Sequence, residues 1–120
     1  MVDMAIKQRS GGEWLEKWAS LLKTIGNPAR LAILLILYAS GEGSLTFTQL
    51  KEIMGLPSDS ALVHHLEILL KAKLIEKIAC KKGEIGRVYP KYQISKLGKE
   101  LLEQTQLAQA LQEYMNRHPK

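Results

Sequence analysis

The chain has 120 residues, enough for one compact domain with its own core and too few for two. Hydrophobic residues make up 46% of it and no run of 18 or more uncharged apolar residues occurs, which excludes an ordinary membrane-spanning helix. The net charge is +5, and residues 57–95, with seven basic and four acidic side chains, hold +3 of it; this indicates a polyanionic partner such as nucleic acid, or a solubilising face.

The N-terminus and the cysteine content bear on location. The first residues contain no apolar signal region, and a single cysteine, Cys80, excludes an internal disulfide and fits a reducing compartment. We therefore expect a cytoplasmic protein. Residues 1–12 are predicted to form a flexible arm, followed by a single domain over 13–120.

The first predicted helix covers residues 13–25 and carries an apolar stripe at spacings of four, three and four. The stripe consists of Trp14, Trp18, Leu21 and Ile25. Gly26 ends this helix, Asn27 caps the next, and Pro28 takes its first position, where the missing N–H does no harm. The second helix is apolar nearly all round, so it is predicted to lie at the centre of the core.

Two shorter helices follow and form a helix-turn-helix pattern over residues 47–72. Thr46 and Gln49 have the spacing of a capping box at the start of the first, which Gly55 closes. Ser58 is placed to cap the second.

A hairpin and a long helix complete the chain. Residues 75–94 predict two strands with a basic tip, and Pro90, which cannot donate to a ladder, places its strand at an edge. Ser95 can cap a final helix over residues 96–117, whose seam repeats at four and three residues, as in a helix with a partner. The seam consists of Leu97, Leu101, Gln104, Ala108, Leu111 and Met115.

The predicted fold is mainly α (α+β): a winged helix-turn-helix with a two-stranded β-hairpin wing and long terminal dimerisation helices over 13–25 and 96–117. A core of this size covers only part of the two terminal stripes, so we expect them to form a homodimer interface. Its candidate residues are Trp14, Trp18, Leu21, Ile25, Leu97, Leu101, Ala108, Leu111 and Met115.

The helix after Ser58 contains two adjacent histidines, and a helical wheel assigns their directions at roughly 100° per residue. The buried sector is predicted to hold Leu62, Val63, Leu66, Leu69 and Leu70. His64 falls opposite that sector together with Ser60 and Lys71, whereas His65 falls on the flank. The two histidines point about 100° apart, so they cannot chelate one metal as residues at i and i+4 would.

The sequence contains none of the motifs that would make the histidines catalytic or metal-binding. No HExxH spacing or thiolate cluster occurs, no nucleophile or paired carboxylate accompanies the histidines, and there is no glycine-rich phosphate loop. We therefore expect no enzyme and no metal or other cofactor.

The exposed face of the histidine helix fits DNA recognition, because a polar N-terminal half can present donors and acceptors to base edges. The alternative, a merely solvated helix face, accounts for the residue types but not for the basic hairpin that follows. The candidate DNA-binding residues are Gln49, Ser58, Ser60, Ala61, His64, His65, Lys71, Lys81, Lys82 and Arg87.

Over residues 13–117 the sequence resembles the ArsR-type winged-helix transcriptional regulators. The phrase TIGNPARLAILLILY is similar to their second-helix signature, ALVHHLEILLKAKLI to their recognition helix, and GRVYPKYQIS to their second wing strand. The resemblance implies the winged-helix fold, a homodimer and double-stranded DNA as partner.

The sequence departs from that family at several places, among them a final helix without the Asp/His constellation that holds zinc. Val63 replaces a common serine, which argues against a base or phosphate contact there, and Lys73 replaces the usual glycine, which asks for a different turn. The cysteine pair of the metal-sensing members is missing from TFTQLKEIMG, which argues against metal sensing and leaves any effector open. Relatives in the wider superfamily serve as protein–protein adaptors, so an adaptor without sequence-specific DNA binding remains the alternative function.

Overall fold

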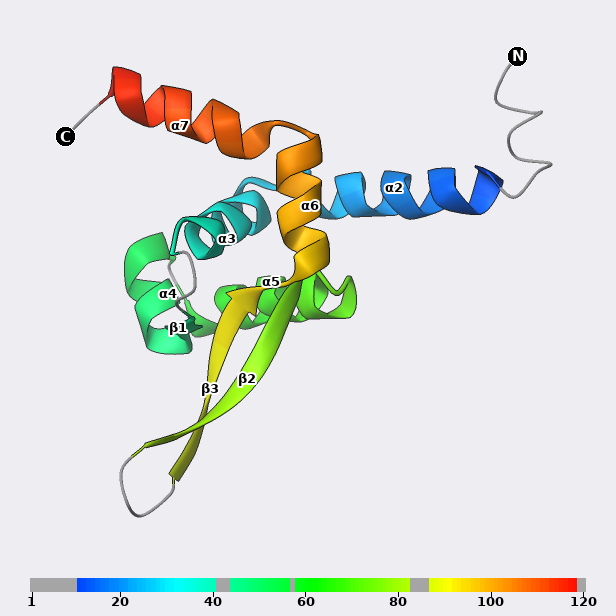
Figure 1. The fold of residues 1–120 in the computed structure, drawn as a ribbon. Helices are drawn as coiled ribbons and strands as arrows, with labels where there is room; N and C mark the ends of the chain where they lie inside the picture. The colour runs from blue at the N-terminus through cyan, green and yellow to red at the C-terminus, as the bar shows by residue number, and fades with distance from the viewer. Residues whose placement is uncertain (1–10, 41–43, 57, 83–86, 119–120) are drawn as a thin grey trace.

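The computed structural model describes residues 11–40, 44–56, 58–82 and 87–118, without the side chains of residues 80–82, 87 and 88. Its elements in chain order are α2 (Gly11–Ile25), α3 (Pro28–Ala39), β1 (Leu45–Thr46), α4 (Phe47–Met54), α5 (Asp59–Lys71), β2 (Ile75–Lys82), β3 (Arg87–Ile94), α6 (Lys96–Gln104) and α7 (Leu107–Arg117). Figure 1 shows the β2–β3 hairpin extending away from the helices, while α2 and α7 extend from the base of the molecule in opposite directions. The fold is the predicted winged helix-turn-helix.

Helix α3 lies at the centre of the core, as its apolar sequence predicts. Its Ile33, Leu34 and Leu37 have no exposed surface. The predicted cap is confirmed, since Asn27 Oδ1 accepts hydrogen bonds from the N–H groups of Ala29 at 2.9 Å and Arg30 at 3.2 Å. Helix α2 ends at Ile25 as predicted, but it begins at Gly11, two residues earlier than expected; residues 1–10 of the predicted arm lie outside the described residues.

The ends of the helices in the helix-turn-helix are set by local hydrogen bonds that the sequence predicts. Thr46 Oγ1 accepts from the N–H of Gln49 at 3.1 Å, and Gln49 Oε1 accepts from the N–H of Thr46 at 2.9 Å, which completes the capping box. Gly55 ends α4 with φ 63°, and Ser58 Oγ caps α5 by accepting from the N–H of Ala61 at 3.3 Å. Helix α5 is held on the core by the fully buried side chains of Leu62, Leu66 and Leu69.

The sheet has three antiparallel strands in the order β1-β3-β2. The strand that contains Pro90 is therefore the middle one, and its predicted position at an edge is wrong. The physical reason is that β1 is only two residues long and pairs with Lys91 and Tyr92. On the wing side of that pairing β3 has only β2 beside it, and there Pro90 lies opposite Ala79. Pro90 is therefore just beyond the end of β1, where β3 has no second neighbouring strand.

The predicted final helix over 96–117 is two helices, which corrects the sequence interpretation. Helix α6 ends at Gln104, and α7 starts after Gln106, a residue in the left-handed conformation with φ 61°. Thr105 Oγ1 donates to Leu101 O at 2.7 Å and caps the break. The four-and-three spacing continues across this break, so it gives no sign of it.

Helix α6 is fastened to the core at both ends. Ser95 Oγ accepts from the N–H of Gly98 at 3.0 Å, which confirms the predicted cap, and donates to Lys73 O at 2.7 Å. At the other end the Tyr38 hydroxyl of α3 donates to Glu103 Oε2 at 3.0 Å. That hydrogen bond, with a smaller contribution from burial, raises the pKa of Tyr38.

Lys73 occupies the turn that ends α5. Its φ of 63° is the left-handed conformation, its N–H donates to Leu70 O at 3.0 Å, and the N–H of Leu74 donates to Leu69 O at 3.0 Å. These two bonds make a Schellman motif, in which glycine is the usual residue at this position. The expected different turn is therefore wrong: the lysine adopts the conformation that glycine favours, at a cost of about 1–2 kcal/mol.

We expect Lys73→Gly to raise the free energy of unfolding by up to about 1 kcal/mol, because relief of the left-handed strain exceeds the extra entropy of glycine in the unfolded chain. Urea denaturation should show a higher midpoint with an unchanged slope. Ala72→Gly is the control, since Ala72 has an ordinary φ of −78° and glycine there should destabilise. Equal effects of the two variants would contradict the assignment of strain to Lys73.

Within the described ranges no single helix is long and apolar enough to span a membrane. Residues 12–25 and 28–39 satisfy the length and composition requirement only when taken together, across a bend of 95°.

Candidate nucleic-acid interface

The surface of α5 divides largely as the helical wheel predicts. Ser60, His64 and Lys71 are exposed, opposite the buried leucines. Leu70 is half-buried, and Val63 is 43% exposed, so its predicted place in the buried sector is wrong. The valine lies at the edge of that sector, where the core ends, and presents an apolar side chain beside the polar face.

Hydroxyl groups cluster at the N-terminus of α5. Ser58 Oγ lies 3.2 Å from Ser60 Oγ, and Ala61 beside them is half-buried. Asp59 in the same turn forms an ion pair with Lys51 of α4. Both partners are exposed, so this pair contributes little stability, but it neutralises the carboxylate that would otherwise repel an anion at this end of the helix.

His65 lies on the flank of α5 and faces inward, toward Arg30 of α3. The Arg30 Nη1 atom is 3.3 Å from His65 Nδ1, and Arg30 Nε donates to Thr24 O at 2.7 Å. His65 is half-buried by these neighbours, whereas His64 is exposed. Sequence reasoning placed His65 on the flank but missed Arg30, because the contact joins residues 35 apart in the chain.

The surroundings of His65 lower its pKa, first through burial, then through the charges of Arg30 and His64. The unfolded chain has the ordinary value of about 6.5. Below that pH the folded state therefore binds fewer protons than the unfolded state. The stability that neutral His65 contributes is present above pH 6.5 and is lost as the pH falls through the lower pKa of the folded state.

The wing carries the remaining predicted cations. Lys82 pairs with Arg87 at the end of the β2–β3 ladder, and Lys81 pairs with Val88. The side chains of Lys81, Lys82 and Arg87 lie outside the described residues, as does the side chain of Cys80.

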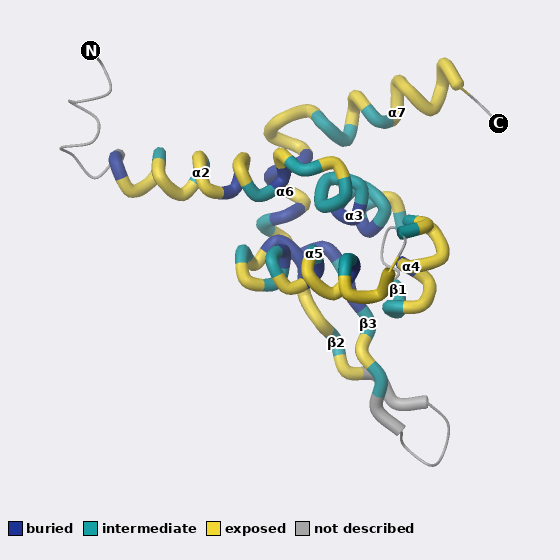
Figure 2. The backbone as a smooth tube through the Cα atoms, turned by 180° about the vertical axis from the view of Figure 1, so that it is seen from behind, coloured by how far each residue is buried: buried dark blue, intermediate teal, exposed yellow. Residues whose placement is uncertain are grey.

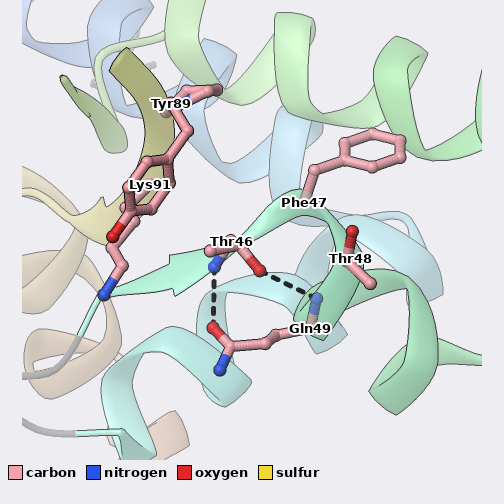
Figure 3. Close-up of a pocket in the computed structure, with 7 residues that line it drawn as sticks. Thr46, Phe47, Thr48, Gln49, Tyr89 and Lys91 are labelled. Atoms are coloured by element: carbon pink, nitrogen blue, oxygen red, sulfur yellow. Dashed lines mark hydrogen bonds between the residues drawn. The ribbon is translucent and has the colours of Figure 1, made fainter. Parts of the chain in front are cut away.

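A hollow of 530 Å³ lies between the start of α4 and strand β3, and Figure 3 shows its residues with the capping bonds of Thr46 and Gln49. Gln49 is the one predicted DNA-binding residue that lines it. Thr48, Tyr89 and Lys91 also line it and were missed, although Tyr89 and Lys91 alternate along one strand, the spacing that puts side chains on one face. The full lining is Thr46, Phe47, Thr48, Gln49, Tyr89, Pro90 and Lys91.

The candidate dimer residues fall into two groups. Leu21, Ile25 and Leu101 are buried in the chain's own core and have almost no surface to offer a partner. The others keep exposed area: Trp14 is 61% and Met115 56% exposed, and Trp18, Leu97, Ala108 and Leu111 are half-buried. Figure 2 shows that exposed residues cover most of α2 and α7.

Two further apolar side chains on these helices were missed: Leu22, 47% exposed, and Tyr114, 59% exposed. Leu22 lies with Trp14 and Trp18 in a shallow groove of 380 Å³ between α2 and α6.

Among the described residues, no group of three or more His, Cys, Asp or Glu side chains is arranged to hold a metal ion.

Among families of known proteins, a model described as a helix-turn-helix domain matches residues 25–78, slightly under half of the chain. The match runs from the end of α2 into β2 and includes both helices of the helix-turn-helix. No curated protein sequence matches the chain.

Three solved structures show the same fold. The transcriptional regulator YodB from B. subtilis is 18% identical with a TM-score of 0.62, over 85% of this chain and 91% of that one. Rv0081 from M. tuberculosis is 26% identical with a TM-score of 0.58, over 85% and 96%. The adhesin competence repressor AdcR from Streptococcus pyogenes is 20% identical with a TM-score of 0.53, over 91% and 81%.

Proposed function

We propose that this protein is a sequence-specific double-stranded DNA-binding transcriptional regulator of the ArsR type, acting in the cytoplasm as a homodimer and without catalytic activity. The observation that carries the proposal is the division of α5, with three leucines fully buried on one side and Ser60, His64 and Lys71 exposed on the other. The buried side fixes the helix on the core, and the polar side suits base edges in a major groove.

Two further features support DNA as the partner. The β2–β3 hairpin extends beside α5 and carries Lys81, Lys82 and Arg87 near its tip, where cations can reach phosphates or the minor groove (Figure 1). YodB and AdcR share this fold. YodB is a transcriptional regulator and AdcR is a repressor, which favours the same class of function here.

The homodimer is supported by the shape of the chain and by its exposed apolar surface. The radius of gyration is 16.8 Å, whereas a compact chain of this length has about 14 Å. Helices α2 and α7 extend outward, as does the β2–β3 hairpin, and the two helices expose Trp14, Leu22, Tyr114 and Met115. Apolar side chains on two projecting helices favour a second copy of the chain as their cover.

One observation favours the second candidate function, a protein–protein adaptor. Ile53 of α4 and Val63 of α5 are 57% and 43% exposed, so both helices of the helix-turn-helix present an apolar side chain. Although Val63 lacks the hydroxyl that a serine would offer to a base or phosphate, its methyl groups suit an apolar contact with a thymine methyl group equally well. DNA binding separates the two functions.

The test is selection of bound duplexes from a random DNA pool, followed by affinity measurements on selected and random duplexes across a salt series. A DNA-binding regulator enriches a sequence and binds random DNA with an affinity that falls steeply as salt rises. Absence of enrichment together with absence of salt-dependent binding would leave the adaptor as the function.

We expect Leu111→Glu to weaken the homodimer and DNA affinity with it, because the charge enters the half-buried apolar side of α7. Gln112→Glu adds the same charge at the next, exposed position and is the matched control. Sedimentation velocity on both variants checks the result. A wild-type chain that sediments as a monomer at micromolar concentration would exclude this interface.

A further inference from the structure

Arg30 connects three helices around the flank of the recognition helix α5. It belongs to the first turn of α3, its Nε atom donates to Thr24 O near the end of α2 at 2.7 Å, and its Nη1 atom lies 3.3 Å from His65 Nδ1 on α5. A single guanidinium thus joins one of the projecting helices to the helix proposed to enter DNA.

The chemistry of this contact determines the tautomer of His65. A guanidinium has only donors and keeps its charge at any physiological pH. His65 Nδ1 must therefore be the acceptor, so the imidazole is neutral and carries its proton on Nε2. The protonated imidazole would bring a second donor and a second positive charge against Arg30.

We propose that Arg30 is a positioning residue for DNA binding, which holds His65 neutral with Nε2–H as the donor available to a DNA phosphate. The inference rests on the proposed function and deepens it, since it adds Arg30, outside the predicted DNA-binding set, and assigns His65 a chemical role different from that of His64. His64 is exposed, whereas half-buried His65 contributes a fixed neutral donor.

The charged groups that face His65 agree with this assignment. Arg30 approaches from α3, and on α5 itself the His64 ring centre lies 5.5 Å away, with no acidic group contributing to the shift. Burial and both neighbours lower the pKa of His65, so within the part of the chain that the structure describes each group acting on it disfavours the charged form. On the α2 side the partner of Arg30 is the uncharged backbone carbonyl of Thr24.

The first experiment needs no DNA: nitrogen chemical shifts of the imidazole across a pH series, on the whole chain. We expect an unprotonated Nδ1 in His65, with a midpoint below that of an ordinary histidine. In Arg30→Gln the midpoint should rise, because one positive neighbour is gone. A proton on Nδ1, or an unchanged midpoint in Arg30→Gln, would overturn the proposal.

The second experiment measures affinity for the selected duplex with two variants at His65. His65→Asn keeps an acceptor at the position of Nδ1 but has no donor at the position of Nε2, and His65→Gln has the reverse. We expect His65→Asn to lose at least about tenfold in affinity, because it loses a hydrogen bond to a charged group, and His65→Gln to lose less. A merely structural contact with Arg30 would give the opposite order, since His65→Asn preserves that contact.

The third readout is the pH profile of DNA affinity in a His64→Gln background, which removes the other histidine of α5. With Arg30 present we expect no gain in affinity as the pH falls through about 6.5. Arg30→Gln should add a gain of at most about tenfold per pH unit for each protomer, because His65 can then take up a proton beside a phosphate. Identical profiles with and without Arg30 would contradict the proposal.

The outcomes separate this proposal from the function on which it rests. A wild-type chain that binds no duplex at any salt concentration overturns the proposed function and the DNA role of His65, while the nitrogen shifts still decide the tautomer. Wild-type binding with His65→Asn at full affinity overturns only the positioning role of Arg30. The urea midpoint of each variant identifies any loss of affinity that arises from unfolding.

Discussion

Gly98→Ala is expected to lower the free energy of unfolding by about 2–4 kcal/mol, because the added methyl group overpacks a close contact. A Cβ at Gly98 would lie 2.3 Å from Leu74 O and 2.7 Å from Ile94 Cγ1. Leu74 O is a backbone atom that accepts from the N–H of Ser95 at 3.0 Å, so it cannot move without breaking that bond. Alanine favours a helix over glycine by about 1 kcal/mol, which offsets only part of the overpacking.

Gly26→Ala is the matched control for that measurement. A Cβ there would approach Leu22 O at 3.3 Å and Lys23 O at 3.4 Å, close contacts that small shifts relieve, and its backbone is not left-handed. We expect a change within about 1 kcal/mol, so thermal unfolding should show a drop of about 10 °C for Gly98→Ala and a small one for Gly26→Ala. Equal stability of the two variants would mean that α6 packs less closely on Leu74 than the structure indicates.

The close packing at Gly98 also supports the proposed DNA-binding surface. Leu74 follows directly on the end of α5, and Ile94 ends the second wing strand, so the same glycine lets α6 seat against both. The recognition helix and the wing therefore share one support. Loss of that close packing should reduce DNA affinity even where the chain remains folded.

Local signals in the sequence predicted the helix boundaries well. Asn27, Thr46, Ser58 and Ser95 were assigned as caps from residue type and spacing alone, and each makes its expected bond. Such caps are predictable because donor and acceptor lie within three residues of each other, so the chain needs no distant partner to form them.

The sequence did not predict features that depend on contacts between distant residues or on the dihedral angle of a single residue. The apolar seam from Leu97 to Met115 keeps its period across the break at Gln106. Gln106 has a left-handed φ, but because it is not a glycine the sequence gives no sign of the break. Lys73 also has a left-handed φ, although lysine rarely adopts that conformation, so its residue type does not predict it. The contact between Arg30 and His65 depends on how α3 and α5 pack, which one helical wheel cannot supply. The wheel therefore predicted which leucines of α5 are buried and which side chains are exposed, while the contact of Arg30 with the flank of that helix appeared only in the folded chain.

The wing and the recognition helix are expected to make separable contributions to DNA binding, and the effect of the wing is the larger in salt dependence. Replacing both Lys81 and Lys82 by Ala should flatten the slope of log affinity against log salt by up to about 4 in a dimer, since each neutralised phosphate contributes about 0.9. Preference for the selected duplex should be largely retained, because phosphate contacts carry no base information. Lys96→Ala with Lys99→Ala is the matched control, as it removes two exposed lysines from α6 instead.

His64→Ala should do the reverse, costing about 1–3 kcal/mol on the selected duplex and little on random DNA. The side chain is exposed opposite the buried leucines of α5, so it can meet a base edge, and its loss leaves the charges of the wing unchanged. The measurement is affinity for selected and random duplexes across one salt series for wild type, the wing variant, its α6 control and His64→Ala. If the wing variant kept its salt slope and lost its preference for the selected duplex, the two surfaces would have exchanged roles: β2–β3 would select the sequence and α5 would bind the backbone.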